Sequence, residues 1–284
     1  FFYYPLPITH YPFWLIPTMR WFLRIITLLF SILILLWGNV HPLWAENLSL
    51  SSALDTLLEQ AFTATQKGQF PQAEIYWSQI IDQYPENPAM WSNRGNVRVS
   101  QNKLEQAISD YNQSIELAPI FPDSYLNRGV AYEGLGEWEK AIADYNQVLA
   151  INPNDAIAYN NRGNAEAGLE NWSAALLDYQ TASDLDKNYS FARGNYALTL
   201  YQLGETETAL KTMKNLVRKY PNFADMRAAL TACLWDIGKP GEAESNWVAV
   251  VGLDARYKNI DWVKNVRRWP PKLVTALNNF LNLK

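Results

Sequence analysis

Amide side chains recur at a fixed spacing through the middle of this 284-residue chain. Asparagine occupies the same position in four successive segments of 34 residues, at Asn93, Asn127, Asn161 and Asn195, and two further asparagines follow at Asn96 and Asn164. An amide offers both a hydrogen-bond donor and an acceptor, so a row of amides can pair with the main chain of an extended peptide whatever its side chains are. The alternative is that these residues only solvate a surface and cap local backbone.

Apolar side chains accompany the amides, at Leu126, Val130, Phe191 and Tyr201. Together with the asparagines they define the candidate peptide-binding groove. Because this set is uncharged, we expect it to bind a neutral, partly apolar segment of a partner protein.

The residues that most enzymes need are sparse. Both histidines, His10 and His41, precede Glu46, so the rest of the chain lacks histidine-based acid–base chemistry and ordinary zinc ligands. The single cysteine, Cys233, cannot form an intramolecular disulfide, and no glycine-rich phosphate loop is present. We therefore expect no enzyme, no cofactor, no metal and no small-molecule substrate, although catalysis by carboxylates alone stays open.

Six alanines lie 34 residues apart, and a fixed period of this length indicates stacked copies of one structural unit. A turn residue precedes each alanine, a large side chain follows it by four residues, and a small residue lies twelve residues before it. Residues four apart share one helix face, so each block predicts two antiparallel helices that approach closely at small side chains. The six alanines are Ala73, Ala107, Ala141, Ala175, Ala209 and Ala243.

The pattern resembles the tetratricopeptide repeat, most clearly at Tyr125, Gly129, Tyr132, Ala141, Tyr145 and Pro153. The resemblance covers residues 54–257 in six blocks: 54–87, 88–121, 122–155, 156–189, 190–223 and 224–257. It implies an all-α, right-handed superhelical solenoid of helix–turn–helix repeats, with the first helix of each repeat lining a concave, protein-binding surface. Blocks five and six depart from the pattern at Arg193 and Arg227, and block six has Ala255 instead of the closing proline.

Three blocks share a second pattern, an arginine followed by an aspartate sixteen residues later. In a helical hairpin these two positions lie level across the helix pair, so we predict three structural ion pairs; contact of the arginines with a ligand is the alternative. The pairs are Arg94–Asp110, Arg128–Asp144 and Arg162–Asp178.

The first 45 residues lie outside the repeats. Residues 19–45 place two arginines before an uncharged, largely apolar run, which is typical of a secretory signal but is also long enough to span a bilayer. Either interpretation exports the repeats across a membrane. Residues 1–18 read as an upstream extension that does not belong to the working protein.

The net charge of −4 is unevenly distributed. Residues 256–284 contribute +6 and residues 1–45 contribute +2, which leaves −12 for the repeats and argues against nucleic acid as a partner. We expect residues 258–284 to form a basic cap on the last repeat. The alternative is that five tail residues contact an anionic membrane or an acidic partner: Trp262, Arg267, Arg268, Trp269 and Lys272.

The Asn-Arg-Gly motifs and the Arg-Arg-Trp-Pro-Pro tail also resemble exported tetratricopeptide proteins of cyanobacterial and chloroplast thylakoids. This resemblance implies a location in the periplasm or thylakoid lumen, soluble or anchored at the N terminus. The resulting hypothesis is a non-catalytic scaffold whose groove holds a partner's peptide segment, in the assembly or maintenance of a membrane complex. The alternative is a membrane-tethered structural adaptor that acts through its basic tail and convex face.

Overall fold

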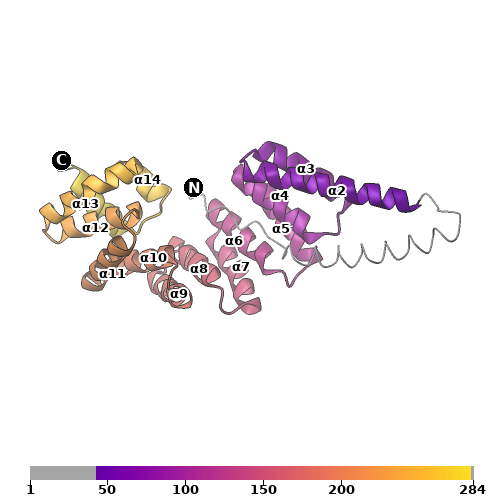
Figure 1. Cartoon of the computed structure of the whole chain (residues 1–284). Helices are drawn as coiled ribbons and strands as arrows, with labels where there is room; N and C mark the ends of the chain where they lie inside the picture. Colours follow the sequence, from indigo (N-terminus) through magenta and orange to yellow (C-terminus); the bar gives the residue numbers. More distant parts are fainter. Residues whose placement is uncertain (1–42, 283–284) are drawn as a thin grey trace. The chain divides into compact units, whose positions relative to one another are not determined.

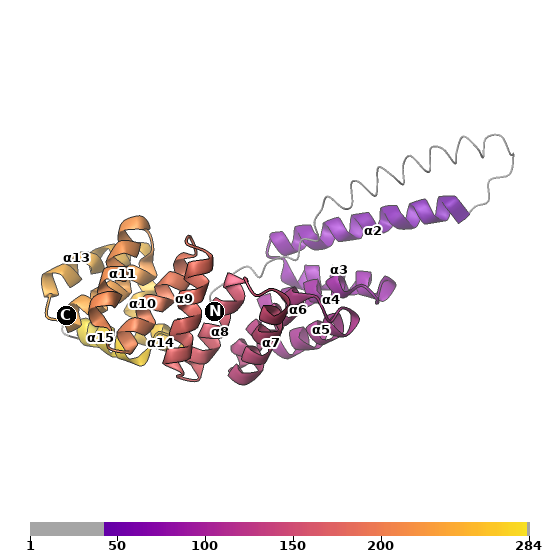
Figure 2. The same ribbon diagram turned by 90° about the horizontal axis from the view of Figure 1, so that it is seen from below.

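The computed structural model describes residues 43–282, which are entirely helical apart from turns and short connections. The predicted upstream extension (1–18) and most of the predicted signal or anchor (19–45) lie outside the described residues. Twelve helices form six consecutive helix–turn–helix pairs in the register that the alanine period predicts (Figures 1 and 2). The pairs are α2 (Leu43–Gln66) with α3 (Phe70–Gln83), α4 (Pro88–Ser100) with α5 (Leu104–Leu117), α6 (Pro122–Leu135) with α7 (Trp138–Ile151), α8 (Ala156–Gly168) with α9 (Trp172–Leu185), α10 (Ser190–Gln202) with α11 (Thr206–Lys219), and α12 (Ala224–Asp236) with α13 (Pro240–Leu253).

The chain divides into two compact units within α6. The first unit ends at Asn127 and holds α2–α5 with the start of α6, and the second begins at Arg128 and holds the remaining elements. Over the described residues, none of the helices is long and apolar enough to cross a membrane.

Each turn inside a pair depends on one residue with left-handed backbone, five positions before the alanine. Four of the six are glycines, for example Gly136 with a φ of 76°. Asn102 and Glu170 take the same conformation in the two pairs that lack glycine there, with φ values of 59° and 60°. Asparagine tolerates this region better than other side chains do, whereas glutamate is strained there. The hairpin geometry therefore imposes the left-handed conformation at this turn position, whichever residue type occupies it.

The two helices of a pair approach most closely where a glycine faces a tyrosine ring. A Cβ atom added to Gly129 would lie 2.5 Å from Cε1 of Tyr145, and Gly95 and Gly163 face Tyr111 and Tyr179 at 2.7 and 2.8 Å. All six alanines of the period are fully buried. The sequence predicts close packing at small residues, and the structure shows that the tyrosine lies directly on the glycine instead of filling a neighbouring gap.

The chain ends in a 3₁₀ turn (Ala255–Lys258), a short helix α14 (Ile260–Asn265) and the predicted capping helix α15 (Pro271–Asn282). α15 packs against α12 and also against α10, so it lies across the first helices of two pairs. Its apolar face is buried through Leu273, Leu277 and Phe280. Phe280 meets Trp235 and Trp247 edge-on, with ring centroids 5.3 Å apart in both cases.

Replacing Gly129 by alanine tests the glycine–tyrosine packing. The new methyl group would overlap the fully buried ring of Tyr145, so we expect Gly129→Ala to lower the free energy of unfolding by about 1–3 kcal/mol. Gly241→Ala is the matched control, because a Cβ atom in that helix meets no atom within 4 Å. The control should keep or slightly raise stability in urea denaturation; equal losses in both variants would contradict the packing argument.

Candidate functional site

The three predicted groove asparagines of the first unit, Asn93, Asn96 and Asn127, are buried. The Oδ1 atom of Asn96 accepts a hydrogen bond of 2.7 Å from the hydroxyl group of Tyr111, the same ring that packs on Gly95. Asn93 is 5% exposed, and Asn127 is fully buried with neither amide atom in a hydrogen bond. Neither a solvated surface nor backbone capping describes these positions. Asn96 in particular holds a tyrosine in place, which corrects its prediction as a groove residue.

In the second unit, the amides of α8 and α10 form a network. Asn195 of α10 donates from Nδ2 to the Oδ1 atoms of Asn160 and Asn164, at 3.1 and 3.2 Å. Asn164 also accepts from the hydroxyl of Tyr179 at 2.9 Å, and Asn161 accepts from Asn160 at 3.2 Å. We call the side of α8 and α10 that carries Asn161, Asn164 and Asn195 the asparagine face.

The network uses the amide oxygens of Asn161 and Asn164 and leaves the donors of these two residues available. Asn161 and Asn164 are half-exposed and lie one helical turn apart, and no hydrogen bond from either Nδ2 group is found among the described residues. Asn160 was missed by the sequence analysis because it stands one position before the repeating asparagine. The Asn160–Asn161 doublet of this repeat was the only signal for it.

Of the predicted apolar groove residues, Leu126 is buried and Val130 is half-buried. Phe191 packs edge-on against Phe223, with ring centroids 5.3 Å apart. Tyr201 is fully buried, its hydroxyl bonded to Asp236 and its ring covered by the Lys272 ammonium group at 4.6 Å. Tyr201 is therefore not open to a ligand, because the chain's own tail lies over it.

Two of the predicted membrane or partner contacts pack into the protein: Trp269 is buried and Arg267 is half-buried. Arg267 donates from Nε and Nη2 to the carboxylate of Asp225, and the indole N–H of Trp269 donates to the same carboxylate at 2.9 Å. The hydroxyl of Tyr257 is a further donor to Asp225, at 2.7 Å. The engagement of Arg267 by Asp225 and the burial of Trp269 correct their prediction as surface contacts. The sequence showed a basic tail and acidic repeats, but it did not indicate that Asp225 would pair with the tail.

The other three tail residues remain at the surface or near it. Trp262 is half-buried between Tyr257 and the Arg256 guanidinium, whose carbon lies 4.7 Å from the indole ring. Arg268 is exposed and reaches the α6–α7 hairpin, where it donates to the Glu133 carbonyl oxygen at 3.3 Å. Lys272 is exposed and donates its backbone N–H to Gln202 at 2.9 Å.

The Glu133 carboxylate lies close to this tail contact. It accepts a hydrogen bond of 2.6 Å from the hydroxyl of Tyr145. Burial raises the pKa of Glu133 to about 7, although this hydrogen bond and the charge of Arg268 act to lower it. The third repeat has Val130 where its two neighbours have Asn96 and Asn164, so its tyrosine hydroxyl turns to Glu133 instead.

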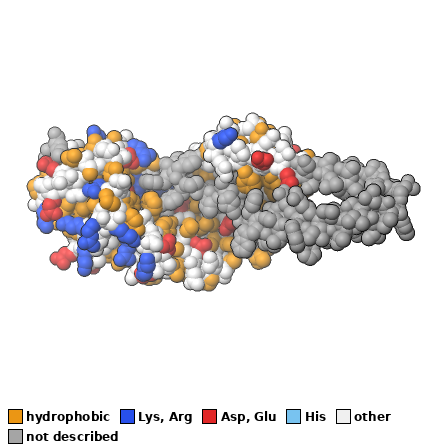
Figure 3. Space-filling model, viewed as in Figure 1, with side chains coloured by type: hydrophobic (Ala, Val, Ile, Leu, Met, Phe, Trp, Pro, Cys, Tyr) orange, Lys and Arg blue, Asp and Glu red, His pale blue; other side chains and the backbone are white. Residues whose placement is uncertain are grey.

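Basic charge on the second unit comes from α11 as well as from the tail. On the face seen in Figure 3, lysine and arginine side chains gather at the left, over the region where Figure 1 places α11. That helix carries Lys211, Lys214, Arg218 and Lys219, which are all exposed. Lys214 pairs with Glu242 of α13 at 3.0 Å.

Each of the three repeated arginines lies against the aspartate sixteen residues later. Arg162 donates from Nε and Nη2 to the two carboxylate oxygens of Asp178, at 2.8 and 2.7 Å. Arg94–Asp110 and Arg128–Asp144 have the same two-bond geometry, with distances from 2.6 to 3.0 Å. The aspartates are buried and the arginines half-buried, so these pairs join the two helices of a hairpin.

A double-mutant cycle on Arg162 and Asp178 measures the strength of these pairs. Because the carboxylate is buried and held by two hydrogen bonds, we expect Arg162→Gln and Asp178→Asn to show a coupling energy of about 1–3 kcal/mol in chemical denaturation. The exposed pair Lys187–Asp184, at 2.7 Å, is the matched control and should give about 0–1 kcal/mol. Similar coupling energies in the two pairs would contradict the expectation that burial makes the Arg162–Asp178 pair stronger.

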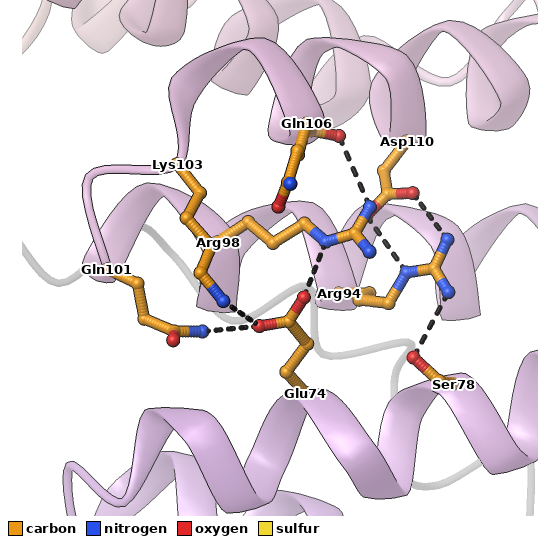
Figure 4. A network of polar contacts seen from close by, with 8 residues as sticks. All are labelled: Glu74, Ser78, Arg94, Arg98, Gln101, Lys103, Gln106 and Asp110. Carbon is orange, nitrogen blue, oxygen red and sulfur yellow. Dashed lines mark hydrogen bonds and ion pairs between the residues drawn. The ribbon is translucent and has the colours of Figure 1, made fainter.

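In the first unit the Arg94 pair extends into a larger network (Figure 4). Arg98 bridges Asp110 at 2.8 Å and Glu74 at 3.0 Å, and Glu74 of α3 also binds Lys103 at 2.7 Å and Gln101 at 2.8 Å. Burial of Glu74 opposes its ionisation, but the hydrogen bonds from Lys103, Gln101 and Arg98 prevail and lower its pKa from 4.5 to about 2. The network ties the second hairpin to α3.

The lowered pKa of Glu74 predicts a pH dependence of stability. The folded chain binds this proton more weakly than the unfolded chain, so the contribution of Glu74 is complete above about pH 4.5 and is lost as the pH falls towards 2. Comparing urea midpoints, we expect Glu74→Gln to be less stable than the parent chain at pH 7 and to approach it near pH 2. A constant difference across this range would contradict the prediction. Glu105, which is exposed on α5, provides the control Glu105→Gln.

No cluster of side chains suited to a metal ion occurs among residues 43–282. Profiles of the tetratricopeptide repeat match residues 122–155 and 195–222, and a profile of the TPR repeat matches residues 95–136. Together with the helical pairs and their register, these matches show that the chain contains tetratricopeptide repeats. A comparison with curated protein sequences gives no significant match.

Solved structures share the fold at low sequence identity. A tetratricopeptide repeat protein from Parabacteroides merdae aligns with a TM-score of 0.63 at 21% identity, over 82% of this chain and 98% of its own. The pilF protein of Pseudomonas aeruginosa gives a TM-score of 0.63 at 14% identity, over 72% and 93%. YrrB, described as a TPR protein with an unusual peptide-binding site, gives 0.51 at 20% identity, over 63% and 92%.

Proposed function

We propose that this protein is a non-catalytic scaffold that binds an extended segment of a partner protein on its asparagine face. The observation that carries the proposal is the pair of half-exposed amides on α8, Asn161 and Asn164, with oxygens fixed by the internal network and N–H groups directed to no partner among the described residues. Two fixed donors one turn apart suit alternate carbonyl groups of an extended main chain, which point to the same side.

Two further considerations support this proposal. Tetratricopeptide repeats bind protein or peptide partners, and YrrB shares the fold and has a peptide-binding site. In addition, the tail of this chain already places a non-helical stretch, residues 267–270, against α10 and α12. The surface formed by first helices therefore accommodates non-helical polypeptide.

Within the same proposal, the repeats act outside the cytoplasm, in a periplasm or thylakoid lumen, on a segment of a membrane complex. The support is the composition of residues 19–45, with arginines before an apolar run. Protease protection of the protein in its native membranes tests the location. The alternative of an adaptor acting through its basic tail loses support, because Arg267 and Trp269 are engaged by Asp225.

A photo-crosslinking residue at position 161 tests the binding surface in the native membrane. We expect it to form adducts with a peptide segment of a specific partner, identified by mass spectrometry, and Asn164→Ala to reduce their yield. The matched control carries the same residue at position 177, because Leu177 on α9 is 65% exposed and lies on a second helix. Adducts from position 177 but none from position 161 would contradict the proposal.

A further inference from the structure

The stretch from Arg267 to Lys272 places its side chains against the repeats, while its backbone turns back onto the end of α14: the N–H groups of Arg267 and Trp269 donate to the carbonyl oxygens of Trp262 and Val263. It has no helical structure between α14 and Pro271, and its side chains reach three different hairpins of the second unit. Arg267 contacts Asp225 of α12 and Asn195 of α10, the latter at 3.4 Å. Arg268 contacts the α6–α7 hairpin, where its guanidinium carbon lies 4.9 Å from the ring of Trp138.

Asp225 is the centre of this contact. Its carboxylate is 4% exposed and accepts hydrogen bonds from the arginine, the indole and the Tyr257 hydroxyl. A buried carboxylate without a cation would be strongly destabilising, so the site selects a positively charged group. The indole of Trp269 also lies beside the Tyr257 ring, with centroids 5.7 Å apart, which adds a place for one aromatic side chain.

The attachment of the tail does not depend on this stretch alone. α15 is held separately through the burial of Leu273, Leu277 and Phe280 against α10 and α12. Arg268, by contrast, is exposed, has a φ of 55° and makes one hydrogen bond of 3.3 Å. Release of the Arg267 and Trp269 side chains from Asp225 therefore does not require α15 to detach.

We propose that Asp225, Tyr257 and Asn195 form a recognition site for a turn segment with arginine two residues before tryptophan, filled in the free chain by Arg267 and Trp269. A partner segment of this chemistry displaces the chain's own residues and gains access to the neighbouring asparagine face. This inference rests on the proposed function, since it names the ligand class of that binding surface.

The test uses a fluorescently labelled synthetic peptide with the sequence of residues 266–272 and the full chain. Arg267→Ala/Trp269→Ala removes the internal competitor, so we expect fluorescence anisotropy to show this variant binding the peptide about a hundredfold more tightly than the parent chain. The matched control Lys258→Ala/Lys264→Ala alters two exposed tail residues and should behave like the parent. A peptide with alanine at both anchor positions should not bind, and adding Asp225→Asn to the variant should abolish binding.

Equal binding by the parent and the double variant, or binding of the alanine peptide, would overturn the proposal. If the double variant does not fold, hydrogen exchange on the parent chain tests whether the peptide displaces the tail residues. Excess peptide should then raise deuterium uptake in residues 266–270, and unchanged uptake refutes displacement. Adducts from position 161 combined with no peptide binding at Asp225 would refute this inference and leave the proposed function intact.

Discussion

The structure depends on one constraint: a single helical hairpin cannot bury its own apolar surface, so its helices must come very close together and then stack. The close approach is made by a glycine on the first helix lying against a tyrosine ring on the second. The ring brings a hydroxyl group into the interior, and a buried hydroxyl needs a partner. Asn96, Asn164 and Glu133 provide that partner in three successive repeats. Part of the polar pattern is thus a consequence of packing.

This constraint separates two kinds of asparagine that look alike in the sequence. Those next to a glycine, Asn96 and Asn164, bind the tyrosine of their own hairpin. Those two residues before the glycine, such as Asn161, are not committed to a tyrosine, and in α8 and α10 they join a network across neighbouring hairpins. The amides of the asparagine face in the second unit are therefore held in a fixed orientation by the repeats beneath them.

The helical pairs and the arginine–aspartate contacts could be anticipated from the sequence, because both follow from local spacing. Residues such as Gly129 and Tyr145 recur at constant intervals, and a hairpin of known length determines which positions face each other. The surface on which the tail packs could not be predicted in this way. The periodicity of Leu273, Leu277 and Phe280 indicates an apolar helix face but not the surface that covers it, and Asp225 is separated from Arg267 by 42 residues. The sign of the charges alone did not indicate which of the many acidic residues would pair with Arg267.

The order in which the chain is synthesised determines when the tail contacts can form. Domains fold from the N-terminal side as they leave the ribosome, and hairpins form early because their contacts are local. The contacts of Arg267 with Asp225 and of Arg268 with Glu133 close over 42 and 135 residues, so they form only after the tail has been made. Until then, the first helices of the fifth and sixth hairpins are not covered by the tail. Newly made protein thus passes through a stage in which this surface is open to any other polypeptide nearby.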